Sequence, residues 1–144
     1  MSTKNFSPRL YEDSDTRAKK AVSRVLRKDG WDIDSKETMN ADIVATKRGR
    51  TTYHEVEIKK VWTSIWPLTW DTIQIPARKE RLFEKVDDLD DLFFWIIRED
   101  TGAAWAIKGS AVKASPKVEV KNRFIPNGEY FFQVPISEAI LLNF

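Results

Sequence analysis

The sequence predicts a single α/β domain in which helices flank a central mixed β-sheet. Two observations support this fold class. Hydrophobic patterns typical of helices and strands alternate along the chain, in the order helix, two or three strands, helix, and further strands. The length of 144 residues, of which 42% are hydrophobic and 32% charged, suits one folded domain. We therefore expect one domain that spans residues 1–144.

Charge and composition exclude several classes of protein. The chain has 24 Lys and Arg against 22 Asp and Glu, so its net charge of +2 does not by itself indicate nucleic-acid binding. The absence of cysteine excludes a disulfide scaffold, a thiolate zinc site and a cysteine nucleophile. The amino terminus is polar, and no apolar stretch has the length of a membrane span. We expect an intracellular, cytoplasmic protein without a membrane partner.

The first predicted element is a helix that begins near Ser14 or Asp15 and ends near Lys28, after a loose lead-in over residues 1–13. Gly30 follows at a position where helices commonly end. One face of the helix is an apolar stripe, formed by Ala18, Ala21, Val22, Val25 and Leu26. Basic residues fill much of the remaining surface, which suits either a solvated face or, with a docked partner, contacts to phosphates.

A hairpin is predicted after this helix. Residues 31–33 and 41–46 have the pattern of short strands, and a turn at residues 47–50 leads into a third strand from Thr51 to about Val61. The hairpin is then followed by a loop rich in tryptophan at residues 62–70. Its aromatic side chains could pack on the core, stack on bases or form a dimer surface.

The second half of the chain adds a helix and more strands. Pro76 is expected to be the first residue of a helix that ends near Val86. The apolar run from Leu92 to Arg98 has the length and the β-branched and aromatic content of a strand buried on both faces. Further strands are predicted at residues 103–107, 118–120 and 130–134, with a final helical turn or short strand at 136–142.

Charged residues alternate with apolar residues along the third predicted strand. Because successive strand residues point to opposite faces, one face carries Tyr53, Glu55, Glu57 and Lys59. A carboxylate and an ammonium two residues apart on a strand lie roughly 6–7 Å from each other, near enough to act on one small substrate centre. His54 points to the other face, and we interpret it as a structural residue.

Asp42 stands at the start of the preceding strand. If the two strands pair through the turn, Asp42 comes alongside the later part of its partner, within reach of Glu57 and Lys59. Two carboxylates and a lysine would then meet at one point. Such oxygen ligands suit Mg²⁺ or Mn²⁺, and the lysine could orient the attacking water. The alternative is an exposed strand face with a cross-strand ion pair.

Asp42, followed after a turn by Glu57-Ile58-Lys59, resembles the D…(D/E)-x-K signature of the PD-(D/E)XK nuclease superfamily. The resemblance covers about residues 14–98, where the order of elements is similar to the family's core of helix, three strands, helix and strand. It implies a restriction-endonuclease-like fold (αβββαβ core) with extra C-terminal strands. It also implies that Asp42, Glu57 and the Ile58 carbonyl hold Mg²⁺ or Mn²⁺, with Lys59 as the catalytic lysine. An acidic residue on the first helix often joins this site, and Asp15 is the candidate. Glu55 adds a carboxylate on the same strand face and could be a further ligand or an edge residue beyond the site.

The resemblance further implies a nuclease that hydrolyses phosphodiester bonds in DNA. In this family the helix after the hairpin packs near the active edge, so five side chains are candidates for phosphate contact: Lys60, Gln74, Arg78, Lys79 and Arg81. Many members are dimers, and a homodimer is compatible with the pattern. The alternatives are a catalytically inactive nucleic-acid-binding or assembly module of the same fold, and a dimeric structural domain that uses the aromatic loop.

Overall fold

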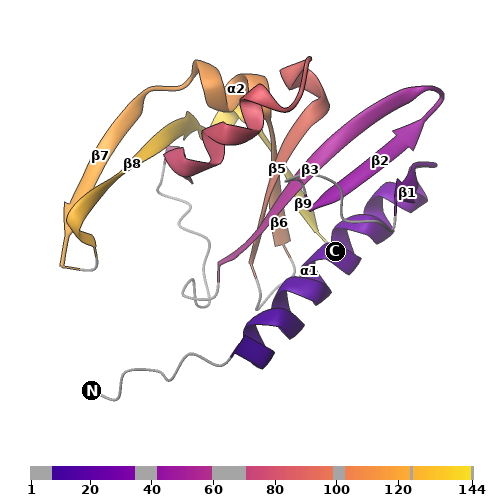
Figure 1. Ribbon diagram of the computed structural model, residues 1–144, viewed down its shortest axis with the longest axis horizontal. Helices are drawn as coiled ribbons and strands as arrows, with labels where there is room; N and C mark the ends of the chain where they lie inside the picture. The colour runs from indigo at the N-terminus through magenta and orange to yellow at the C-terminus, as the bar shows by residue number, and fades with distance from the viewer. Residues whose placement is uncertain (1–7, 35–41, 60–70, 99–102, 124, 144) are drawn as a thin grey trace.

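The computed structural model describes residues 8–34, 42–59, 71–98, 103–123 and 125–143, and it describes their side chains except those of 8–16, 58, 59, 98, 103, 142 and 143. In chain order, with η for 3₁₀ helices, the elements are α1 (Pro8–Lys28), β1 (Asp32–Asp34), β2 (Ile43–Lys47), β3 (Arg50–Lys59), β4 (Thr72–Pro76), η1 (Ala77–Glu84), η2 (Leu89–Asp91), β5 (Leu92–Arg98), β6 (Ala103–Lys108), α2 (Gly109–Ala114), β7 (Lys117–Asn122), β8 (Ile125–Pro135), η3 (Ile136–Glu138) and β9 (Ala139–Asn143). Figure 1 shows their arrangement.

Two β-sheets form the framework of the molecule. The larger sheet has six strands in the order β1-β2-β3-β5-β6-β9, with β3 and β5 parallel and the other neighbours antiparallel. A second, antiparallel sheet has the order β4-β8-β7, and its β7–β8 hairpin projects away from the larger sheet in Figure 1. The predicted α/β class and the central mixed sheet are therefore confirmed, whereas the second sheet was not predicted.

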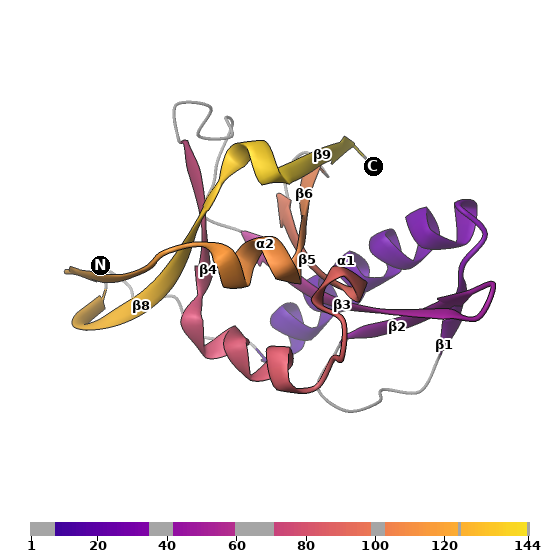
Figure 2. The same ribbon diagram turned by 90° about the horizontal axis from the view of Figure 1, so that it is seen from above.

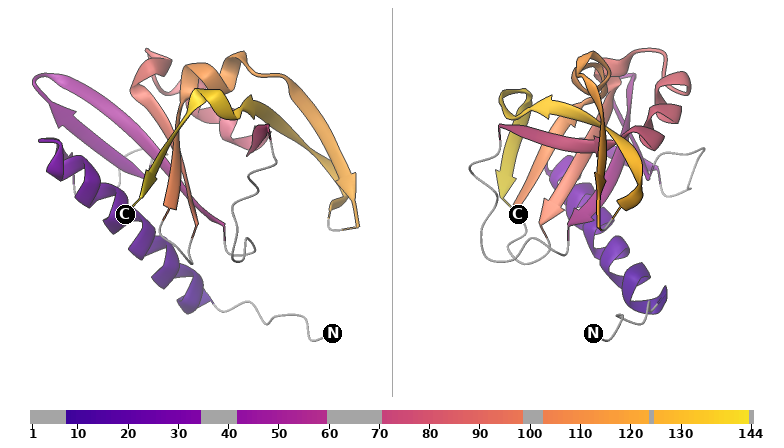
Figure 3. Two further views of the ribbon diagram at one scale, coloured as in Figure 1. Left: turned by 180° about the vertical axis from the view of Figure 1, so that it is seen from behind. Right: turned by 90° about the vertical axis from the view of Figure 1, so that its left-hand side faces the viewer.

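The larger sheet is covered on both faces. Helix α1 packs on one face, while the second sheet, η1 and α2 pack on the other (Figures 2 and 3). Strand β5 lies within the larger sheet and supplies side chains to both cores. Leu92, Phe94 and Ile96 belong to the core beneath η1, and Trp95 and Ile97 belong to the core beneath α1. The prediction of a strand buried on both faces is confirmed.

The β2–β3 hairpin has a two-residue turn. Arg48 and Gly49 have φ angles of 51° and 79°, and two successive residues with positive φ are typical of the tight turns that match strand twist. The pairing runs from Lys47 opposite Arg50 to Ile43 opposite His54. The predicted turn is thus confirmed, and it fixes which residues of the two strands lie opposite each other.

Two predicted boundaries were wrong. Helix α1 begins at Pro8 and not near Ser14, because proline suits the first turn of a helix and the polar residues before Ser14 gave no apolar stripe to detect. Pro76 does not begin a helix. It is the last residue of β4, opposite Phe131 of β8, and the helix that follows is a 3₁₀ helix from Ala77.

Two short elements were not predicted, and two predicted segments cannot be compared with the structure. Strand β4 and helix α2 were not predicted, because both are short and neither has a distinctive pattern. The tryptophan loop at residues 62–70 and the end of the third predicted strand, residues 60–61, lie outside the described residues. Within the described part of the chain, no helix combines the length and apolar character needed to cross a membrane.

Candidate active site

The hairpin register decides which side chains meet at the candidate site. Since Ile43 lies opposite His54, the chain just before β2 brings Asp42 toward Glu55 of β3. We expected Asp42 alongside Glu57 and Lys59, which lie two and four residues further along the strand. Glu55 and Glu57 point to the same face, as predicted from the alternation of strand side chains. The register therefore brings Asp42 to the part of β3 that carries Glu55, and the Asp42 charge acts on this carboxylate.

Asp42 binds two other parts of the protein. Its Oδ2 accepts a hydrogen bond of 2.8 Å from the backbone N–H of Val56, and its Oδ1 lies 3.4 Å from the ammonium of Lys19 on α1. The carboxylate therefore satisfies a donor of β3 beside the start of β2 and links the hairpin to the helix. Because an ionised carboxylate has about four lone-pair positions, these two contacts leave acceptor capacity for a further ligand.

Glu55 is the most deeply buried carboxylate of the site, with 6% of its surface exposed. Its Oε1 accepts a hydrogen bond of 2.6 Å from the ammonium of Lys79 on η1, whereas its Oε2 has no hydrogen-bond partner among the described residues. Burial is the main cause that raises the pKa of Glu55, and the nearby charge of Asp42 adds to it. Two basic residues oppose this increase in the pKa: Lys79 through its hydrogen bond and its charge, and Arg81 through its charge.

The remaining residues of the predicted triad lie further along β3. Glu57 is half-buried and lies opposite Ile96 of β5, and Lys59 is the last residue of the strand. The backbone of Ile58 lies between them, but the side chains of residues 58 and 59 lie outside the described part. Convergence of the Lys59 ammonium on the two carboxylates therefore stays a prediction.

The candidate phosphate contacts are in different surroundings. Lys79 forms an ion pair with Glu55, and its side chain is only 14% exposed. It therefore does not face solvent, as a phosphate contact would require. Arg78 forms an exposed ion pair of 2.9 Å with Glu129 of β8, and the Arg81 guanidinium contacts the Arg78 carbonyl at 3.4 Å. Gln74 lies on β4, opposite Gln133, and this strand leads directly into η1.

Two further predicted site residues have no described side chain. Lys60 lies outside the described residues, and Asp15 lies on α1 with a side chain outside them. The expectation that the segment after the hairpin packs near the site agrees with the structure, because Lys79 and Arg81 of η1 both act electrostatically on Glu55. Lys19 was not predicted as a site residue. The alternation along β3 placed Glu55 on the same face as Glu57 and left open whether it is a further ligand or an edge residue.

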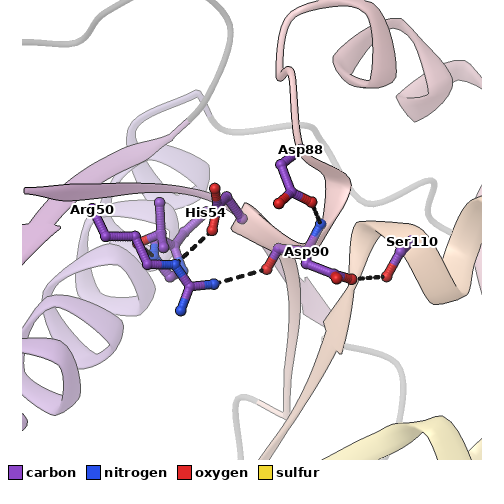
Figure 4. Close-up of polar contacts among 7 residues, drawn as sticks. Arg50, His54, Asp88, Asp90 and Ser110 are labelled. Carbon is purple, nitrogen blue, oxygen red and sulfur yellow. Dashed lines mark hydrogen bonds and ion pairs between the residues drawn. The ribbon is translucent and has the colours of Figure 1, made fainter.

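The acidic segment at η2 is a second group of carboxylates, and its members bind donors of the protein itself (Figure 4). Arg50 donates to the Asp91 carboxylate at 2.6 Å and to the Asp90 carbonyl at 3.3 Å. The Asp90 carboxylate accepts a hydrogen bond from Ser110, and Asp88 accepts one from the Asp90 backbone at 3.0 Å. This segment therefore connects β3 to α2 and serves the fold.

His54 lies on the opposite face of β3 from the acidic residues and is 2% exposed, as its structural role predicts. The Trp95 indole donates to Nδ1 at 2.9 Å, so the proton of the neutral ring is on Nε2, which lies 2.8 Å from Thr52 Oγ1. The ring also stacks on Phe93 at 5.3 Å between centroids. His54 is thus a satisfied core residue and not a metal ligand of the site.

Burial lowers the pKa of His54 from 6.5 to about 4, which predicts a pH dependence of stability. Above pH 6.5 the ring is neutral in both the folded and the unfolded state, so the protein has its full stability. Below pH 6.5 the unfolded state binds a proton that the buried ring does not, so the free energy of unfolding falls as the pH decreases toward 4. The expected loss is about 3 kcal/mol over this range. Urea unfolding of the wild type and of His54→Gln between pH 7 and pH 4 measures it. Parallel pH profiles of the two proteins would contradict the assignment.

Comparison with protein-family models and with curated protein sequences found no match. In the described part of the chain, no three acidic or histidine side chains are close enough together to form a metal-binding group.

The residues that are present nevertheless fit Mg²⁺. This ion is usually held by only one or two carboxylates and keeps several waters, unlike cations that need a complete protein cage. Asp42 and Glu55 supply two carboxylates, and Glu55 Oε2 is a buried oxygen without a hydrogen-bond partner among the described residues. Two adjacent carboxylates beside lysine and arginine side chains can hold a divalent cation and attract a phosphate group.

Proposed function

We propose that the protein is a metal-dependent nuclease that hydrolyses phosphodiester bonds in DNA, with a restriction-endonuclease-like fold. The observation that carries the proposal is the hairpin register, which brings Asp42 to the acidic segment of β3 that ends in Glu57-Ile58-Lys59. In addition, α1, the antiparallel strands β1–β3, η1 and the parallel strand β5 have the same order as the elements of the family's core, with β4 and η2 as insertions.

The chemistry of the proposal assigns a role to each residue of the site. Asp42, Glu57 and the Ile58 carbonyl would hold Mg²⁺ or Mn²⁺, which when bound lowers the pKa of water and stabilises charge on the phosphate. Lys59 would orient the attacking water and interact with the phosphate. Arg81, which acts electrostatically on Glu55, would add positive charge near the scissile group.

A catalytically inactive nucleic-acid-binding module of the same fold is the second candidate, and one observation favours it. Both oxygens of Asp42 already contact the protein, through the Val56 N–H and the Lys19 ammonium. A carboxylate in this position would have a structural role even if it had lost its metal.

Cleavage assays distinguish the two candidates. We expect the purified protein to cut at least one of supercoiled plasmid, linear duplex, single-stranded and branched DNA in Mg²⁺ or Mn²⁺, and to cut none in EDTA, because the reaction requires the metal. A Lys59→Met preparation controls for contaminating nucleases. Binding to DNA without cleavage in either metal would reject the nuclease and support the inactive module.

A further inference from the structure

Glu55 has a feature that the proposed function does not use. Only 6% of the Glu55 surface is exposed, and only one of its two carboxylate oxygens, Oε1, has a hydrogen-bond partner among the described residues. More than about 90% of buried polar groups in proteins have a partner, and an exception often marks a place where an ion or a water molecule binds. Within the part of the chain that the structure describes, Oε2 is therefore an acceptor without a donor.

The surroundings of Oε2 favour a cation as its missing partner. An ionised carboxylate is costly to bury, and one ammonium on Oε1 compensates only part of this cost. Asp42 adds a second negative charge near Glu55, because it directly precedes Ile43, which lies opposite His54. Lys19 binds Asp42 and Lys79 binds Glu55, so among the described residues each carboxylate has one ammonium and retains further lone pairs.

We propose that Glu55, through Oε2, and Asp42 are ligands of a divalent metal ion, Mg²⁺ or Mn²⁺, and that the Lys79 ammonium compensates part of the Glu55 charge when the ion is absent. The inference rests on the proposed function for its catalytic meaning. Resemblance to the nuclease family selects Glu57 as the partner of Asp42, whereas the register selects Glu55. Both oxygens are of the hard type that these ions prefer.

Direct binding of Mn²⁺ tests the inference without any measurement of cleavage. Free Mn²⁺ is followed by electron paramagnetic resonance during titration of the full chain, its Glu55→Gln variant, and a Glu84→Gln control on the exposed surface of η1. We expect Glu55→Gln to weaken binding at least about tenfold, since even the loss of an outer-shell partner costs that much. Glu84→Gln should bind as the wild type does. Equal affinity of Glu55→Gln and wild type would overturn the inference.

A crystal of the wild-type protein soaked in Mn²⁺ gives a second test that needs no variant to fold. Anomalous density in contact with Glu55 Oε2 supports the inference, and density at Glu57 without contact to Glu55 overturns it. The two proposals fail separately. If the protein cleaves DNA but Glu55→Gln binds Mn²⁺ as the wild type does, only the inference is rejected. If Mn²⁺ binding depends on Glu55 but no DNA is cleaved, only the proposed nuclease is rejected.

Discussion

Replacing Lys59 by methionine is expected to lower the rate of DNA cleavage by about 10²–10⁴-fold, the range typical for a group that assists proton transfer. Lys59 ends β3 directly after the acidic segment, so its ammonium would act on the attacking water and the phosphate and would not be a metal ligand. Methionine keeps the length of the apolar stem and removes the charge. Single-turnover cleavage with saturating Mg²⁺ measures the loss.

Binding measurements separate this loss from a defect in the metal site. Mn²⁺ affinity of Lys59→Met should equal that of the wild type, because the carboxylates are unchanged. Lys108→Met is the matched control, because Lys108 is an exposed lysine at the end of β6. Lys108 lies opposite Phe93 of β5, whereas Lys59 lies opposite Arg98 at the other end of that strand. Undiminished cleavage by Lys59→Met would mean that another group positions the water.

Local patterns predicted the parts of the fold that depend on neighbouring residues. The apolar run of β5, the alternation along β3 and the Arg48-Gly49 turn are each encoded within about ten residues, and each was found where the sequence placed it. The turn also set the register, which determines the partner of Asp42. Counted from that turn, the pairing brings Asp42 toward Glu55, whereas convergence of Asp42 with Glu57 and Lys59 stays a prediction.

The remaining features depend on contacts between distant parts of the chain. Pro76 has the φ angle of a helix start, but pairing with Phe131, 55 residues later, makes it the end of a strand. The burial of Glu55 could not be predicted either, because its partner Lys79 lies 24 residues away on η1. An acidic residue in an alternating strand is usually exposed, and only the packing of η1 over this face changes that.

Replacing Lys79 by methionine is expected to destabilise the protein by about 3–5 kcal/mol at neutral pH, the usual cost of removing one partner from a buried ion pair. The two side chains of this pair are 14% and 7% exposed, so solvent screens the uncompensated Glu55 charge poorly. Urea unfolding at pH 7 without divalent cations measures the loss. The adjacent Arg78→Met variant is the control, because the Arg78 side chain is 63% exposed and its ion pair should contribute at most about 1 kcal/mol.

Divalent cations should reverse part of this loss if Glu55 is a metal ligand. Methionine leaves Glu55 without its ammonium, so a cation at Oε2 becomes the principal source of compensating charge and should bind more tightly to Lys79→Met than to the wild type. A ligand that binds only the native state raises the free energy of unfolding with the logarithm of the ratio of ligand concentration to Kd, when the ligand is in excess of Kd. Mn²⁺ should therefore raise the unfolding free energy of Lys79→Met more than that of Arg78→Met. Equal increases in the two variants would show that the cation does not reach the Glu55 carboxylate.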